Sequence, residues 1–414
     1  MQNLKSDLQK ELVENILPYW MNKFVDNENG GFYGQIDGRE QLHPQANKGA
    51  ILNARILWTF SAAYRVVKNP EYLVIAERAY NYIIERFIDK ENGGVFWELD
   101  YLGKPVNTKK QAYAQGFALY GFSEFYRATG NTEALEWAKN FFHLIEKYCY
   151  DSDKGGYFEA FTRDWQPIED MRLSEKDANE KKTMNTHLHI LEPYTNLMRI
   201  WKTPETVTVM RNLIDVFTDK ILNKKTNHLN LFFDENWECK STEISYGHDI
   251  EASWLIFEAA EVLGDEELLN RLKPVCLNIA NAAYEGLQPD GSLIYEAAPL
   301  SPLPCGEGLG EGSFHLDRDC CGEGLHLDRD RHWWVQAEAV VGSAYAYKIS
   351  GNADYLRKAQ QTWDYIKNYI IDRENGEWFW SAYPDGKPNR KDDKAGFWKC
   401  PYHNARMCLE VMCV

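Results

Sequence analysis

The chain has 414 residues, of which 44% are hydrophobic and 26% are charged, and its formal net charge is −16. This composition is typical of soluble globular proteins and excludes disordered and membrane-spanning chains. The negative charge argues against nucleic acid and acidic membrane surfaces as partners and favours a neutral ligand.

The first twenty residues predict an amphipathic helix and not a signal peptide. Leu4, Leu8, Leu12 and Ile16 fall at helical spacing, and the stretch has no apolar leader core. No later apolar run is long enough to cross a membrane. The nine cysteines form no CxxC pair and no regular framework, which indicates reduced thiols in a cytoplasmic protein.

A turn motif recurs along the chain. Turns rich in glycine or asparagine, each followed by aromatic, strand-like residues, begin at Asn29, Asn92, Lys154, Asn227, Asp290 and Asn375. Between successive turns lie two segments with the apolar periodicity of a helix. The predicted helices cover residues 2–24, 48–68, 71–89, 112–129, 132–149, 184–201, 204–222, 248–263, 266–284, 333–350, 353–371 and 400–413.

Twelve helices in six pairs predict an all-α fold, an (α/α)6 barrel, with residues 1–414 as a single catalytic domain. Six inner helices would line a central cavity, six outer helices would surround them, and short β-hairpin-like connections would lie at the active-site rim. A linear helical solenoid has the same periodicity and is the alternative fold.

Residues 299–331 lengthen the last repeat. The segment is rich in glycine and proline and nearly duplicated, since both Cys-Gly-Glu-Gly and His-Leu-Asp-Arg-Asp occur twice. We predict an inserted, mobile low-complexity loop. A metal site built from its His, Cys and Asp residues is the alternative, but the duplication itself explains these residues. The loop lies near the predicted rim, where it could obstruct the cleft, cover it or have no effect.

The second helix of each predicted pair is expected to be an inner one, so the inner helices begin at one rim. Polar and aromatic residues gather at these helix starts, as expected for a binding site. The free N–H groups there also favour a developing negative charge. The candidate site residues are Arg55, Tyr113, Asn185, His189, His248, Glu251, Trp254, Trp334, Glu338, Trp398 and His403. Arg55 alone is equally a candidate for a buried salt bridge.

Two histidines, His248 and His403, each lie at an inner-helix start with acidic and tryptophan residues nearby. Glu251 follows His248 by three residues, on the same helix face, where it could orient the imidazole. His187 and His189 lie on different faces, which is a poor spacing for a metal pair. The histidines favour general acid–base catalysis, with removal of a proton next to a carbonyl. A glycosidase that uses two of the carboxylates is the alternative.

Five stretches resemble motifs of the N-acylglucosamine 2-epimerase superfamily: residues 48–58, 183–189, 245–254, 333–338 and 398–404. The resemblance covers the whole chain apart from the inserted loop. Residues 246–254, Tyr-Gly-His-Asp-Ile-Glu-Ala-Ser-Trp, are most similar to the cellobiose 2-epimerase branch. The family fold is an (α/α)6 barrel, in agreement with the helix count.

The resemblance implies reversible inversion at C2 of the reducing-end sugar of a β-1,4-linked disaccharide, through an enediolate. Cellobiose would become glucosyl-mannose, and lactose would become epilactose. His248 and His403 would be the acid–base pair, and His189 would assist ring opening or hold the open-chain oxygen. Arg55 would stabilise the enediolate oxygens. No metal or other cofactor is implied, and the protein is expected to be a monomer.

The other candidates would orient the histidines or bind the sugar. Glu251 and Glu338 would contact histidines or sugar hydroxyls. Asn185 and Tyr113 would hydrogen-bond the reacting sugar, and the remaining candidates, Trp254, Trp334 and Trp398, would wall or stack on the sugar subsites. Three other functions fit the same residues: a monosaccharide aldose–ketose isomerase or mannose- or N-acylglucosamine-type 2-epimerase, a glycoside hydrolase, and a non-catalytic sugar-binding barrel.

Overall fold

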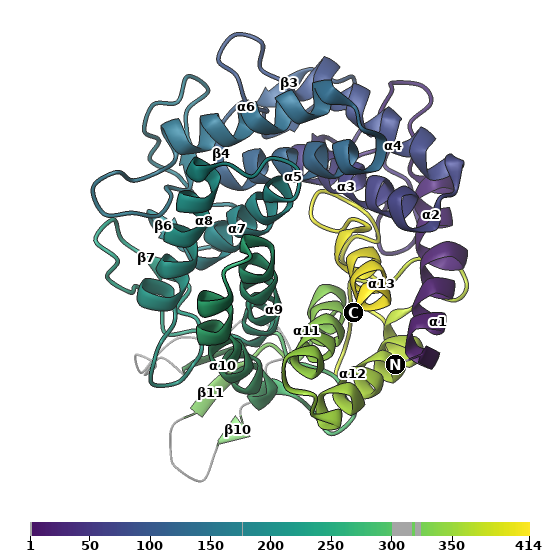
Figure 1. The fold of residues 1–414 in the computed structure, drawn as a ribbon. Coiled ribbons are helices and arrows are strands. Elements are labelled where there is room, and N and C mark those ends of the chain that lie inside the picture. The colour runs from purple at the N-terminus through teal and green to yellow at the C-terminus, as the bar shows by residue number, and fades with distance from the viewer. Residues whose placement is uncertain (1, 176, 300–316, 319–323) are drawn as a thin grey trace, which may run out of the picture.

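The computed structural model describes residues 2–175, 177–299, 317–318 and 324–414, and its helices form two concentric rings (Figure 1). The inner helices are α3 (Ala50–Val67), α5 (Ala112–Thr129), α7 (Met184–Met198), α9 (Tyr246–Leu263), α11 (Trp333–Ser350) and α13 (Tyr402–Cys413). Each contacts the next, and α13 contacts α3. The ring therefore closes, which confirms the predicted (α/α)6 barrel and rejects the linear solenoid.

The outer ring runs around these six helices. It consists of α1 (Gln2–Glu11) with η1 (Leu12–Ile16) and α2 (Leu17–Lys23), α4 (Pro70–Tyr82) with η2 (Ile83–Phe87), α6 (Thr132–Tyr148), α8 (Pro204–Val216) with η3 (Phe217–Ile221), α10 (Glu266–Ala283) with η4 (Tyr284–Gly286), and α12 (Ala353–Tyr365) with η5 (Ile366–Ile370). The predicted helices agree with these bounds to within a few residues.

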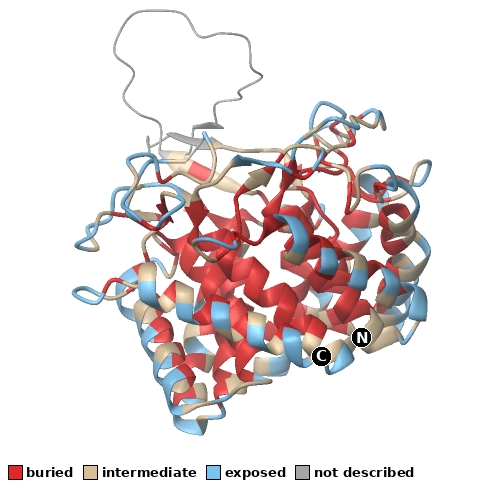
Figure 2. Cartoon of the chain, turned by 90° about the horizontal axis from the view of Figure 1, so that it is seen from above, coloured by how far each residue is buried: buried red, intermediate tan, exposed pale blue. Residues whose placement is uncertain are grey.

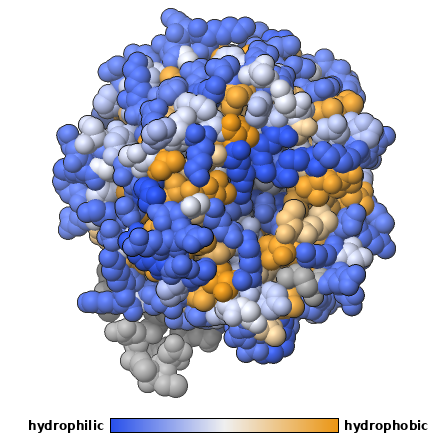
Figure 3. Space-filling model, in the orientation of Figure 1, coloured by the Kyte–Doolittle hydropathy of each residue, from blue (hydrophilic) through white to orange (hydrophobic). Residues whose placement is uncertain are grey.

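The inner and outer rings of helices differ in how far their residues are buried. In α6 the buried residues, among them Ala134, Ala138, Phe141 and Ile145, form one stripe, as expected for a helix with one face in solvent. In α5 every residue of 112–125 is buried, because the helix is enclosed on all sides. Figure 2 shows the buried centre and the exposed outer surface. The face seen in Figure 3 is mainly hydrophilic, and its apolar side chains lie in separate groups.

Short strands lie where the inner helices begin. They are β1 (Lys48–Gly49), β2 (Glu98–Leu99), β3 (Pro105–Asn107), β4 (Lys110–Gln111), β5 (Ala160–Phe161), β6 (Lys182–Thr183), β7 (Phe232–Phe233), β8 (Ile244–Ser245), β9 (Glu296–Pro299), β10 (Asp317–Arg318), β11 (Gly324–Leu327), β12 (Arg331–His332) and β13 (Ser381–Ala382). The pairs β1–β2, β4–β5, β6–β7, β8–β9 and β12–β13 are antiparallel and join neighbouring repeats. The predicted hairpin-like turns are local antiparallel bridges within each repeat: Val25–Phe32, Ile88–Val95, Tyr150–Tyr157, Leu222–Leu229, Leu287–Leu293 and Ile371–Trp378.

A buried ion pair repeats beside these strands. The lysine–aspartate pairs are Lys48–Asp26, Lys110–Asp89, Lys182–Asp151 and Lys394–Asp372, with N–O distances of 2.5–3.0 Å. In the first three pairs the lysine also donates to a glycine carbonyl of the recurring turn. These three lysines begin the rim strands β1, β4 and β6, so each pair fixes the turn of one repeat against the inner-helix start of the next.

Most of the predicted insertion at 299–331, with its predicted mobility and its alternative metal site, lies outside the described residues. Within the described part, β9 pairs antiparallel with β11, and β11 with β10. Among the described helices none is both long and apolar enough to span a membrane. The described cysteines Cys149, Cys239, Cys276, Cys400, Cys408 and Cys413 are free thiols.

We expect Lys48→Met to lower the free energy of unfolding by about 3–5 kcal/mol, because the variant leaves Asp26 buried without its cation. Urea denaturation measures the change. Lys10→Met is the matched control, because Lys10 pairs with Glu14 on the exposed surface and contributes about 1 kcal/mol or less. Equal, small losses in the two variants would contradict a structural role for the buried pair.

Candidate active site

His403, in the first turn of α13, is held by a carboxylate. Its Nδ1 lies 2.7 Å from Oε1 of Glu338 on α11. Because a carboxylate only accepts, Nδ1 carries the proton and Nε2 is left with a free lone pair. Burial lowers the pKa of His403 to about 3, although Glu338 acts in the opposite direction. The imidazole is therefore neutral at pH 7 and able to accept a proton.

His248, in the first turn of α9, is held by a hydroxyl. Its Nδ1 lies 2.7 Å from Oγ of Ser245. Burial, with smaller contributions from His189 and His403, lowers the pKa of His248 to about 3. Both histidines lie against the half-buried ring of Trp334, with centroid distances of 4.9 Å for His248 and 5.6 Å for His403. The barrel therefore brings together two histidines from helices far apart in the sequence.

Gly247 makes this arrangement possible. A Cβ added at Gly247 would lie 2.8 Å from the Trp334 ring and 2.9 Å from Val335. Any larger residue would push α11 or the indole away from the start of α9. The glycine before His248 is thus required for the close approach of Trp334.

Glu251 lies beside His403 and not beside His248. Its Oε1 accepts from Nη2 of Arg406 at 2.5 Å and lies 3.9 Å from Nδ1 of His403. The prediction that Glu251 orients His248 is therefore wrong. The spacing of three residues does place both side chains on one helix face, but Glu251 meets Arg406, and Ser245 holds the histidine.

Trp254 differs from its prediction as a sugar-stacking wall. Its side chain is 1% exposed, and its indole N–H donates to Oε2 of Glu338 at 3.0 Å. Arg406 lies over its ring at 4.8 Å. Trp254 therefore supports the carboxylate that holds His403.

Arg406 connects the acidic groups of the site. Its Nη2 donates to Glu251 and Glu338, and its Nη1 donates to Glu192 and to the Tyr402 hydroxyl. Glu192 in turn accepts from the Tyr402 hydroxyl and lies 2.6 Å from Nδ1 of His189. The guanidinium is fully buried, so these carboxylates provide its counter-charge.

Glu192, Tyr402 and Arg406 are missing from the predicted site. Two of them carry a signal in the sequence: Glu192 follows His189, and Arg406 follows His403, by the three residues that separate His248 from Glu251. Each histidine of the site therefore has a charged residue on its own helix face. The same spacing rule, applied to all three histidines, identifies both residues.

The two carboxylates that share Arg406, Glu251 and Glu338, have pKa values shifted in opposite directions. Burial and the Glu338 charge raise the pKa of Glu251. Burial also opposes ionisation of Glu338, but Arg406 and His403 outweigh it and lower the pKa of Glu338. Ligand atoms of Glu251, Glu338 and His403 lie within 4.8 Å of one another, a spacing that suits a metal ion. Arg406 already bonds both carboxylates and supplies the positive charge there.

Arg55 is a buried cation of a different kind. Its Nη2 donates to the Tyr113 hydroxyl at 2.8 Å, and its guanidinium lies over the rings of Phe117 at 4.2 Å and Tyr402 at 4.8 Å. Among the described residues no carboxylate lies within ion-pair distance of it, and its Nε has no acceptor. The alternative of a buried salt bridge therefore fails there, and the unbalanced charge suits an anion that forms on a bound ligand.

The remaining predicted residues surround these groups. The Tyr113 ring lies 4.8 Å from His189 and 6.1 Å from the half-buried Trp398. Burial lowers the pKa of His189. Asn185 lies on the other side of the site, where it lines a rim cavity of about 80 Å³ together with His248 and Tyr295. Its buried Oδ1 has no partner among the described residues, so it is available to a ligand.

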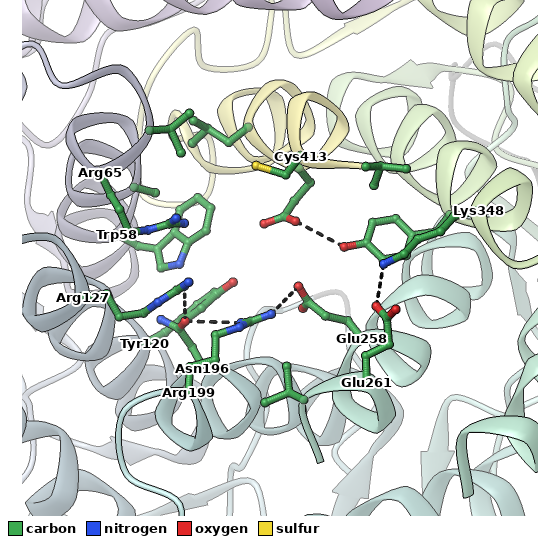
Figure 4. Close-up of a pocket in the computed structure, with 17 residues that line it drawn as sticks. Trp58, Arg65, Tyr120, Arg127, Asn196, Arg199, Glu258, Glu261, Lys348 and Cys413 are labelled. Atoms are coloured by element: carbon green, nitrogen blue, oxygen red, sulfur yellow. Dashed lines mark hydrogen bonds and ion pairs between the residues drawn. The ribbon is translucent and has the colours of Figure 1, made fainter. Parts of the chain in front are cut away.

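A larger cavity, of about 310 Å³, lies where the inner helices end, at the opposite end of the barrel (Figure 4). The basic residues that line it are paired: Arg65 and Arg127 with Glu124, Arg199 with Glu258, and Lys348 with Glu261. They belong to the last turns of their helices or the residue just after, where a cation offsets the partial negative charge of the helix end. This cavity is a structural charge network, away from the histidines.

The N-acylglucosamine 2-epimerase (GlcNAc 2-epimerase) family model matches residues 31–298 and 313–406, so the match omits part of the predicted insertion. A cellobiose 2-epimerase of Bacteroides fragilis is 55% identical over 99% of this chain and 98% of that protein. A cellobiose 2-epimerase of Ruminococcus albus is 40% identical over 98% of each chain. The solved cellobiose 2-epimerase of Bacillus thermoamylovorans has a TM-score of 0.89 and 41% identity, covering 100% of this chain and 99% of that one.

We expect the rings of His248 and His403 to stay neutral down to about pH 5, whereas His228 keeps its proton to a higher pH than an ordinary histidine. Burial opposes the charged form of His228 too, but its bond to Asp249 outweighs burial and raises its pKa. Nitrogen-15 NMR of the histidine rings measures all three. Titration of His248 and His403 near their ordinary pKa of about 6.5 would contradict the enclosed site.

The same pKa values predict a loss of stability in acid. The unfolded chain binds protons at these histidines below about pH 6.5, whereas the folded chain resists them down to about pH 3. Stability is therefore lost as the pH falls through this window. Urea denaturation of His403→Gln should show a shallower loss between about pH 6.5 and pH 4 than the parent protein. An unchanged slope would contradict the assignment.

Proposed function

The chain belongs to the N-acylglucosamine 2-epimerase family, and we propose that it inverts C2 of the reducing-end sugar of β-1,4-linked disaccharides such as cellobiose and lactose. One observation carries the chemistry: two neutral histidines, His248 and His403, lie against the same ring of Trp334, and Arg55 in the same site has no ion-pair partner among the described residues. The substrate class comes from the cellobiose 2-epimerase relatives, which match this chain over its whole length.

Ring opening comes first, because the C2 proton becomes acidic only beside the C1 carbonyl of the open-chain sugar. His189 carries a carboxylate, Glu192, on its Nδ1. Its Nε2 can therefore accept the hydroxyl proton at O1 and return a proton to the ring oxygen. Tyr113, beside His189, hydrogen-bonds the same end of the sugar.

Epimerisation then needs a base and an acid at C2. One histidine takes the C2 proton through Nε2, and the C–H electron pair forms the C1–C2 double bond while O1 gains the negative charge. Arg55 stabilises this enediolate. The other histidine takes a proton from solvent at Nε2 and delivers it to the opposite side of C2, the double bond re-forms the C1 carbonyl, the first histidine releases its proton to solvent, and the ring closes. In the reverse direction the two histidines exchange roles.

Glu338 stabilises the imidazolium form of His403, as the carboxylate of a Ser-His-Asp triad does for its histidine. Trp254 and Arg406 fix Glu338 in turn. Trp334 and Trp398, both half-buried, offer ring faces to the sugar, and Asn185 offers its unpaired amide oxygen.

Hydrolysis fits the site less well. Glycosidases hold two carboxylates about 5–9.5 Å apart across the scissile bond. Glu251 and Glu338 have oxygens within 4.8 Å of one another, and both bond Arg406. Solved family 76 glycoside hydrolases and a D-mannose isomerase share the fold, but at 19% identity or less they bear on the fold alone.

We propose a monomer as the catalytic unit, because one barrel supplies all three histidines with their partners, and residues 1–414 as one catalytic domain. The free thiols of the described cysteines support a cytoplasmic location. The scheme uses no metal and no organic cofactor.

Incubation with cellobiose in deuterated water tests the proposed reaction. We expect glucosyl-mannose with deuterium at C2, because the enzyme-bound proton exchanges with solvent, and NMR detects both. Lack of product and of C2 exchange would reject the proposal. Release of free glucose would indicate a hydrolase, and faster reaction of free mannose would indicate a monosaccharide enzyme.

We expect His248→Ala and His403→Ala each to lower kcat for cellobiose by about 10²-fold or more, the usual effect of losing a positioned acid or base. His143→Ala is the control, because His143 is exposed on the outer helix α6. A mild effect in both site variants would mean that other groups move the proton.

A further inference from the structure

Ser245 occupies the N-cap position of α9, but its side chain does not cap the helix. Its backbone is extended. A serine in this position usually accepts a hydrogen bond from a backbone N–H of the first turn. Thr183 does so before α7, and Thr203 does so before α8. The Ser245 hydroxyl instead lies 2.7 Å from Nδ1 of His248.

The position of this hydroxyl is rigid. Ser245 is fully buried and belongs to β8, where it pairs with Glu296 of β9. His248 follows three residues later, in the first turn of the helix that Ser245 precedes. Among the described residues, the bond to Ser245 is the one hydrogen bond that the His248 ring makes. The hydroxyl thus sets the orientation of the ring and places Nε2 at the opposite edge.

The two histidines therefore have unlike partners. Glu338 can only accept from His403, and its negative charge stabilises the protonated ring. The Ser245 hydroxyl can donate to or accept from Nδ1 of His248, and it carries no charge. It can accompany His248 through a change of protonation, but it stabilises the imidazolium much less than a carboxylate does.

We propose that Ser245 is a positioning residue that aims Nε2 of His248 at the substrate and leaves His248 the weaker base of the pair. The inference rests on the proposed epimerisation. Proton removal from the two faces of C2 is then assisted differently. When His403 is the base, the Glu338 carboxylate assists it. When His248 is the base, it depends on the Ser245 hydroxyl.

Ser245→Ala should lower kcat for cellobiose by about 10-fold or more, because an unheld ring loses its reactive geometry. It should lower the Tm only slightly, because the variant loses one side-chain hydrogen bond and no helix cap. Ser245→Thr, which keeps a hydroxyl, should restore most of the rate. Thr203→Ala is the matched control: it removes a true cap, so it should lower the Tm and leave kcat unchanged. A full rate in Ser245→Ala, or a rate that falls only in proportion to a lower Tm, would overturn the proposal.

Isotope effects test the asymmetry. Cellobiose and glucosyl-mannose, each deuterated at C2, report proton removal by the two different histidines. In Ser245→Ala the primary isotope effect should rise in one direction only, the one in which His248 is the base. An equal change in both directions would overturn the proposal. A parent protein that exchanges no C2 proton would instead reject the proposed function, so the two failures are distinguishable.

Discussion

The site depends on one buried cation. Arg406, on the last inner helix, bonds Glu192 of α7, Glu251 of α9 and Glu338 of α11. Moving these charges out of water is costly, and the cost is offset only when each is paired and hydrogen-bonded. Two of the carboxylates then hold histidines, since Glu192 contacts His189 and Glu338 contacts His403. A single guanidinium thus sets the positions of two imidazoles on two helices.

The two ends of the barrel also differ in their electrostatics. All six inner helices begin at the same end, so their N-terminal N–H groups converge on the histidines and favour an anion there. Arg55 adds a cation with no carboxylate of its own among the described residues. At the other end, the basic residues Arg65, Arg127, Arg199 and Lys348 balance the helix C-termini (Figure 4). The end with the histidines, where we propose that an enediolate forms, and the end with the paired basic residues are thereby kept apart.

Enclosure keeps His248 and His403 neutral. The buried surroundings lower the pKa values of His248 and His403, so both rings are neutral and ready to accept a proton near pH 7. The rim strands and their lysine–aspartate pairs keep the helix starts in place around them. Their different partners, a hydroxyl and a carboxylate, make two otherwise similar groups unequal.

Local periodicity determined the helices and the rim. The pairing of the helices predicted which of them are inner, and the polar residues at the starts of those helices marked one end as the site. Only the closed ring decided which side chains meet. A spacing of three residues places Glu251 on the face of His248, but it cannot say that this face meets Arg406, 155 residues away in the sequence. Contacts of this kind, including the one between Trp254 and Glu338, arise because α13 returns to α3 and turns every inner face toward one axis.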